Sequence, residues 1–250
     1  MSEGIYIAGS GALIQKRKLE VLANNIANVN TVGFKEDKVS FNVANLTGLK
    51  NDKPGNDFAS EGTRLIPSKL PFKTFTNFSP GHLEHTGNSL DIALEGDGFF
   101  CIETTEGTQY TRKGNFTLNH EGIMVTQEGL PVLGEGGTIQ IDASDFVVDA
   151  KGNIVVDGSV VATIKVVDFP QSSLEKAGNT RFTTLDPMNK GETAEGVNVK
   201  QGYVEHSNVN IIRMMTDMID TLRGYESYQK IIRSLNDIDS KAINELGSVD

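Results

Sequence analysis

The first thirty residues place apolar side chains at the spacing of an α-helix. Successive members of this set lie three and four residues apart in strict alternation, which is the heptad spacing of a helix with one buried stripe. The stripe consists of Ile5, Ala8, Ala12, Gln15, Leu19, Leu22, Ile26 and Val29. No proline precedes Pro54. We therefore expect a helix of roughly 25 residues, about 40 Å long, which stops before Gly33 and uses that glycine as a left-handed cap.

The C-terminal sixty residues repeat this pattern over a longer stretch. Their apolar stripe advances by three or four residues at each step and contains Ile211, Met215, Met218, Leu222, Tyr225, Tyr228, Ile232, Leu235, Ile238, Ala242 and Leu246. Two places have consecutive steps of three, so the stripe is not a strict coiled-coil seam. No proline follows Pro187. The pattern predicts a second long helix, with Ser207 or Asn208 as its N-cap.

Between these ends the sequence is of β type. Short apolar runs alternate with turn dipeptides such as Asp97-Gly98, Glu106-Gly107 and Asp157-Gly158, which favours antiparallel hairpins. The expected strands lie near 90–94, 99–104, 109–112, 116–118, 124–126, 146–149, 154–156 and 160–169.

The layout predicts an α+β protein with a discontinuous helical domain. An isolated amphipathic helix cannot shield its own apolar stripe from water, so each terminal helix needs the other, or a neighbouring chain, as its partner. We expect residues 1–35 and 206–250 to form a coiled-coil-like helical core domain. Residues 36–72 would be a connecting linker, and residues 73–205 an inserted, antiparallel all-β outer domain.

Composition narrows the possible functions. The chain carries 23 Lys and Arg against 33 Asp and Glu, a net charge of −10, which argues against a nucleic-acid surface and against binding to an anionic membrane face. The single cysteine, Cys101, excludes an internal disulfide and a multi-cysteine zinc site; we expect it to be buried as a small apolar residue. The apolar run at 4–15 is too short to span a bilayer. Its positive charges follow it, so it lacks the order of a cleaved signal peptide.

No catalytic arrangement stands out. Asp91, Glu95 and Asp97 cluster, and a pair of carboxylates is what a glycosidase requires. However, Glu95 and Asp97 each precede a glycine, as in ordinary turns, and no nucleophile with a base and an orienting group is visible. We expect a protein that is not an enzyme and has no metal or cofactor.

The end of the first helix is rich in asparagine, which is a poor helix former. Asn24, Asn25, Asn28 and Asn30 fall within seven positions. Two interpretations are open: a fraying helix end that leads into a turn, or amide side chains that hydrogen-bond across a helix bundle and set its register.

Five blocks of this sequence resemble the axial family of the bacterial flagellar basal body, the rod and hook proteins. In chain order they are Ala23–Lys35, Phe78–Phe100, Tyr110–Phe116 with its continuation through Val125-Thr126, Gly129 and Pro131–Gly134, then Gly202–Asn210 and Arg223–Glu226. Ser89 stands where the family usually has proline, and Gly224 where it more often has alanine. A glycine inside a helix costs about 1 kcal/mol, and Gly224 is a place where a neighbouring chain could approach closely.

The resemblance implies a structural subunit that polymerises into a tube. Its terminal helices would pack together and against those of neighbours around an export channel, and would transmit torque. Its partners would be copies of itself, other rod proteins and, during secretion, the flagellar type III export apparatus; neither nucleic acid nor membrane insertion is expected. It would lie in the periplasmic rod, exported without a cleaved signal. Length and block order favour a proximal-rod protein, with the distal-rod protein as the alternative.

The expected assembly interface combines the stripes with the asparagine-rich junctions. It contains Leu19, Leu22, Asn24, Asn25, Ile26, Asn28, Asn30, Gly33, Phe34, Asn208, Asn210, Met215, Met218, Leu222, Tyr225, Ile232 and Leu235. Two other classes remain open. A secreted β-rich adhesin or carbohydrate-binding protein would be a monomer with ordered ends, and a free coiled-coil scaffold would form a closed oligomer.

Overall fold

The computed structural model describes residues 3–41, 72–143, 145–178, 180–186, 188–189, 191–194 and 196–246. Most of the predicted linker, 36–72, lies outside these residues. The chain divides into two compact units. Among the described residues, the helical unit holds 3–26, 37–41, 72–75 and 211–246, and the β unit holds 27–36 and the described part of 76–210.

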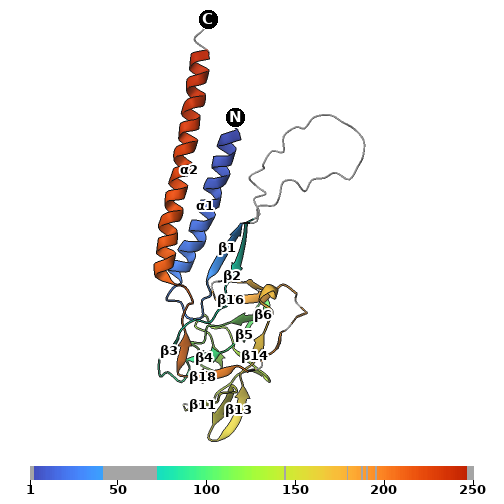
Figure 1. Cartoon of the computed structure of the whole chain (residues 1–250). Coiled ribbons are helices and arrows are strands. Elements are labelled where there is room, and N and C mark those ends of the chain that lie inside the picture. Colours follow the sequence, from blue (N-terminus) through green and yellow to red (C-terminus); the bar gives the residue numbers. More distant parts are fainter. Residues whose placement is uncertain are drawn as a thin grey trace, which may run out of the picture. The chain divides into compact units, whose positions relative to one another are not determined.

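Helices stand at both ends of the chain and strands fill the middle, so the predicted α+β class is confirmed (Figure 1). Helix α1 spans Glu3–Ala27 and helix α2 spans Ile211–Leu246. The two lie side by side in the helical unit, together with a two-stranded sheet of β1 (Asp37–Phe41) and β2 (Phe72–Thr76). No helix in the described part of the chain has the length and apolar character needed to cross a membrane.

The predicted stripe of α1 is the shielded side of that helix, since all of its members are buried or half-buried. The prediction for Gly33 was wrong in part. Gly33 does adopt a left-handed backbone, with φ of +70°. However, α1 ends six residues earlier, at Ala27, so Gly33 does not cap it. A Cβ there would lie 2.4 Å from the backbone nitrogen of Lys113. The glycine is therefore required by close packing inside the β unit.

The predicted stripe of α2 merges two different faces of the helix. The shielded positions include a row that steps by four and three residues: Met214, Met218, Thr221, Tyr225, Tyr228, Ile232, Leu235 and Asp239. By contrast, Ile211, Met215, Leu222 and Ile238 are exposed. The shielded face includes the polar Thr221, whose hydroxyl donates to the Asp217 carbonyl at 2.6 Å. Hydrophobicity alone therefore placed the stripe on the wrong face over the first turns. The N-cap prediction was also wrong, because α2 begins at Ile211 and the Asn208 side chain bonds elsewhere.

Strands of the β unit pair antiparallel throughout. A six-stranded sheet has the order β15-β16-β6-β5-β14-β17. Its strands are β15 (Leu174–Lys176), β16 (Arg181–Thr184), β6 (Gly107–Thr111), β5 (Phe99–Thr104), β14 (Val166–Asp168) and β17 (Glu192–Thr193), and a 3-10 turn, Gln171–Ser173, precedes β15.

Smaller sheets complete the unit. They pair β19 (Tyr203–Glu205) with β3 (Leu83–His85), β18 (Asn198–Gln201) with β4 (Ile92–Glu95), β7 (Thr117–Leu118) with β8 (Met124–Val125), β9 (Leu133–Gly134) with β10 (Gly137–Thr138), and β12 (Asn153–Val156) with both β11 (Val147–Val148) and β13 (Ser159–Thr163).

Strand β5 is buried on both faces and organises the core. Phe100 and Ile102 belong to one apolar cluster, whereas Phe99 and Cys101 belong to a second. Successive strand residues point to opposite faces, so one strand contributes to both clusters. Cys101 is buried, as predicted.

The expected strand at 160–169 is in fact two strands. β13 pairs only with β12, whereas β14 pairs with β5 and β17. The break falls at Ile164, whose amide donates to the Gly152 carbonyl at 2.8 Å. A continuous apolar run cannot reveal that its two halves belong to different sheets.

The boundaries of the two compact units differ from the predicted domain boundaries, because 27–36 and 206–210 belong with the β unit. Phe34 and Lys35 are fully buried there.

Candidate functional site: the helix pair and the chain connectors

Small residues let α1 and α2 approach closely. A Cβ at Gly11 would lie 2.4 Å from the Tyr228 ring, and one at Gly224 would lie 3.1 Å from the Gln15 amide nitrogen. Gly224 thus faces α1 of the same chain, where the sequence suggested a neighbouring chain. Gly11 and Gly224, which cost helix propensity, are explained by contact between the helices of one molecule.

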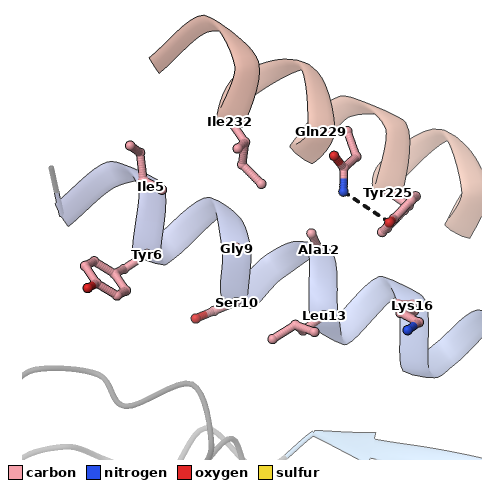
Figure 2. Close-up of a pocket in the computed structure, with 10 residues that line it drawn as sticks. All are labelled: Ile5, Tyr6, Gly9, Ser10, Ala12, Leu13, Lys16, Tyr225, Gln229 and Ile232. Atoms are coloured by element: carbon pink, nitrogen blue, oxygen red, sulfur yellow. Dashed lines mark hydrogen bonds between the residues drawn. The ribbon is translucent and has the colours of Figure 1, made fainter. Parts of the chain in front are cut away.

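A groove of about 300 Å³ opens beside this contact, near the start of α1 (Figure 2). Its lining is mostly apolar and comprises Ile5, Tyr6, Gly9, Ser10, Ala12, Leu13 and Lys16 of α1 with Tyr225, Gln229 and Ile232 of α2. In Figure 2, Ile232 points toward α1, whereas Tyr6 and Leu13 point away from α2. Gln229 donates to the Tyr225 hydroxyl at 3.1 Å. A Cβ at Gly9 would meet no atom within 4 Å. The groove offers apolar surface rather than a constellation of reactive groups.

A second apolar stripe on α2 faces solvent. Ile212, Met215, Ile219 and Leu222 are 75%, 50%, 52% and 46% exposed, and they follow one another at steps of three, four and three residues. This is again the spacing of one helix face. The stripe is separate from the shielded face that packs in the helical unit. A contiguous row of large apolar side chains exposed to water is typical of a surface that another molecule covers.

The predicted interface residues fall into three groups by exposure. Buried are Leu22, Asn25, Asn28, Gly33 and Phe34; half-buried are Leu19, Ile26, Asn208, Met218, Tyr225, Ile232 and Leu235; exposed are Asn24, Asn30, Asn210, Met215 and Leu222. The structure brings members of the first two groups into the interior of one chain and leaves the third group at the surface. Their role between chains stays a prediction.

At Asn25 the structure favours the second interpretation of the asparagine-rich helix end, because this side chain is held by hydrogen bonds, one of them to the other helix. Asn25 is 1% exposed, and its side chain makes a reciprocal pair of bonds with the backbone of Asp37. Its Nδ2 donates to the Asp37 carbonyl at 2.8 Å, and its Oδ1 accepts from the Asp37 amide at 2.9 Å. This side chain therefore ties the end of α1 to the start of β1. It is not frayed, and its Nδ2 also bonds across the helix pair, to the Met214 sulfur of α2 at 3.9 Å.

A buried ionic cluster lies in the β unit. Lys35 and Glu205 are each 1% exposed and Arg112 is 4% exposed. Lys35 Nζ lies 2.6 Å from Glu205 Oε1 and donates to the Ser79 carbonyl at 3.0 Å, and Arg112 Nη1 lies 3.5 Å from Glu205 Oε2. Glu205 Oε1 also accepts from the Gly81 amide at 2.8 Å. One carboxylate thus serves two buried cations.

Burial in this cluster disfavours the charged forms of Lys35 and Arg112. Burial lowers the pKa of Lys35, and Glu205 only partly offsets this. Burial lowers the pKa of Arg112 in the same way, again against the attraction of Glu205. The guanidinium also donates to the Gly96 carbonyl at 2.8 Å and lies over the Phe99 ring. Glu205 is therefore the group on which the cluster depends.

The sequence did not point to these three residues as a functional cluster, although each lies in one of the five segments that resemble the rod and hook proteins. Lys35 and Glu205 each follow an apolar residue, Phe34 and Val204, but polar residues come directly after them, so the sequence carries no clear signal of their burial. Their convergence from positions 35, 112 and 205 is a tertiary fact. Two of the three carboxylates considered for catalysis have structural partners: Asp91 accepts from Thr86 Oγ1 at 2.6 Å and Glu95 pairs with Lys200 at 3.0 Å. Across the described ranges, no cluster of His, Cys, Asp or Glu is arranged to hold a metal ion.

Three family models match successive parts of the chain. They are a flagella basal body rod protein model at 5–35, a flagellar hook protein FlgE/F/G D1 domain at 93–161, and a flagellar basal body rod FlgEFG protein C-terminal model at 200–245. The first and last cover most of the two helices, and the middle one covers part of the β unit.

Curated relatives match along the whole chain. The flagellar basal-body rod protein FlgF of Mesorhizobium japonicum is 33% identical, with 99% of each chain covered. FlgG of Bacillus subtilis is 35% identical, with 98% of this chain and 99% of its own length covered, and FlgF of Caulobacter vibrioides is 32% identical over the full length of both. None of these relatives supports the adhesin alternative. The chain belongs to the flagellar basal-body rod protein family, of the FlgF/FlgG type, whose members are structural proteins of the basal-body rod.

Proposed function

We propose that this chain polymerises helically in the rod through its terminal helices, which act as a coiled-coil-like core. The observation that carries the proposal is the exposed stripe of Ile212, Met215, Ile219 and Leu222 on α2. The shielded faces of α1 and α2 already pack within one molecule, so this stripe is free to meet another. Burying one large aliphatic side chain contributes about 1.5–3 kcal/mol, and four in a row are enough to drive association in a crowded assembly.

The groove beside the helix pair is a second surface suited to assembly. Stripe and groove are different surfaces of the helical unit, so a contact between them would be head-to-tail. Head-to-tail contacts that do not close on themselves produce helical polymers. In such a polymer the helices would line a channel and transmit torque, the partners would be further copies and other rod proteins, and the domain division predicted from sequence would separate a helical core from an outer β domain.

Membership of the family supports a proposal for the export route and for the position in the rod. We propose export of the unfolded chain through the flagellar type III apparatus to the periplasmic rod. The FlgF and FlgG relatives match at similar identity, 33% and 35%. We favour the proximal rod on length and block order and keep the distal rod as the second candidate.

Single substitutions can test the helical interface. Leu222→Asp places a charge on the exposed stripe, and Ser227→Asp places the same charge at another exposed position of α2. We expect Leu222→Asp to abolish motility and remove the rod from purified basal bodies, while the isolated chain keeps wild-type unfolding behaviour. Ser227→Asp should swim. Wild-type swimming by Leu222→Asp would contradict the proposal.

Leu22→Asp makes a useful contrast. Leu22 is buried within the chain, so this change should also loosen the helical unit of the isolated molecule, seen as faster amide exchange in both helices. If Leu222→Asp loosened the isolated chain equally, the stripe would be part of the fold rather than an assembly surface.

A further inference from the structure

The chain passes between its two units four times, at 26/27, 36/37, 75/76 and 210/211. A polymer that transmits torque must carry force across these passages. A peptide segment without bonds to its surroundings can be pulled straight until it spans about 3.3–3.6 Å per residue. Hydrogen bonds around the passages therefore decide how force is divided among the four segments.

One side chain in the β unit hydrogen-bonds the chain segments that adjoin three of these passages. The Asn208 side chain, two residues before the last passage, accepts from the Glu36 amide at 2.8 Å. Its Nδ2 donates to the carbonyls of Asn77 and Ser79, at 2.8 and 2.9 Å. A single amide thus bonds the segments that precede passage 36/37, follow passage 75/76 and precede passage 210/211.

Further bonds reinforce the same cluster. The Asn77 amide donates to the Glu36 carbonyl at 2.8 Å, and the Gly33 amide donates to the Glu205 carbonyl at 2.7 Å. The Lys35–Glu205 ion pair joins the first and last of these segments again. The segment 27–36, which begins at passage 26/27, is therefore bonded to the segment that leads into α2.

The helical unit has its own counterpart. Asn25, one residue before passage 26/27, holds both backbone groups of Asp37, which immediately follows passage 36/37. Its Nδ2 also lies 3.9 Å from the Met214 sulfur, in the first turn of α2 after passage 210/211. In each unit, then, one asparagine amide links segments that are far apart in sequence but adjoin the passages.

We propose that Asn208 in the β unit and Asn25 in the helical unit are positioning residues that make the four passages carry force together. Without these two side chains, force applied to the β unit would extend the segments at the four passages one after another. With them, these segments bear the force at the same time, and none can lengthen until its hydrogen bonds to the others break. The proposal rests on the proposed function, because it assigns these side chains a role in torque transmission.

Rotation of single flagella under two loads tests this. Cells producing Asn208→Ala, Asn25→Ala or a control, Lys200→Gln, are compared with wild type using a small and a large bead on the flagellar filament. The control removes the ion pair with Glu95, at the surface of the β unit. We expect both asparagine variants to assemble rods and turn small beads at wild-type speed, but to lose sustained rotation with large beads. The control should match wild type at both loads.

Three outcomes would overturn the inference. Wild-type rotation of large beads by both variants would show that the amides carry no load. An equal loss at both loads would show an assembly defect only. A load-dependent loss in one variant alone would show that the two amides do not act together. Failure of the proposed function would look different, since a strain lacking this chain would then build rods and swim. Thermal unfolding of each purified variant checks that the unit carrying the substitution still folds.

Discussion

Glu205→Gln should destabilise the β unit more than any other single charge change in it. The wild-type cluster has two buried cations and one carboxylate, a net charge of +1. Glu205→Gln raises this to +2 and leaves Lys35 and Arg112 without a counter-ion. Removing one partner from a buried ion pair costs about 3–5 kcal/mol. At a urea dependence of about 2–3 kcal/mol per molar, the unfolding midpoint should fall by about 1–2.5 M.

Lys35→Met is the matched comparison. It lowers the net charge of the cluster to zero and leaves Glu205 paired with Arg112, so it should cost less than Glu205→Gln even though the Lys35 bond to the Ser79 carbonyl is lost. Lys200→Gln breaks an exposed ion pair of the same unit and should change stability by no more than about 1 kcal/mol.

Urea unfolding followed by far-ultraviolet circular dichroism, with amide exchange resolved to the β unit, gives the three values. The reasoning fails if Lys35→Met is the more damaging of the two buried changes. It also fails if Glu205→Gln costs no more than the exposed control, because the carboxylate would then not be holding two desolvated cations.

Two further predictions concern packing and the buried thiol. Gly11→Ala should destabilise the helical unit by about 1–3 kcal/mol, because its Cβ would overlap the Tyr228 ring. Gly9→Ala, whose Cβ would meet no atom, should stabilise the unit by up to about 1 kcal/mol. Amide exchange in the helices distinguishes the two variants, and equal effects would contradict the close contact at Gly11. Burial raises the pKa of Cys101 to about 12, so its contribution to stability is complete below about pH 9 and is lost as pH rises through 12. At pH 8 a thiol reagent should label Cys101 only as fast as the β unit unfolds, and rapid labelling of the native chain would disprove the burial.

Local patterns in the sequence were sufficient for the helices and for most hairpins. The three-and-four spacing from Ile5 to Ile26 identifies the shielded face of α1, because this spacing keeps apolar side chains on one side of a helix; Tyr6, Ile7 and Leu13, which lie off this spacing, are exposed. Glycine-containing turns predicted β5 with its observed limits, since short loops between apolar runs favour antiparallel neighbours.

Only the tertiary structure could separate the two apolar faces of α2. Met214 and Thr221 are shielded while Met215 and Leu222 are exposed, and hydrophobicity does not rank these residues in that order. What decides is the close approach of α1, which the glycines permit. The cluster of Lys35, Arg112 and Glu205 is equally invisible in the sequence, because a charged residue is read as exposed until its partner, 170 positions away for Lys35 and Glu205, is brought beside it by the fold. Sequence periodicity determined which elements form, whereas long-range packing determined which of their side chains remain available to other molecules.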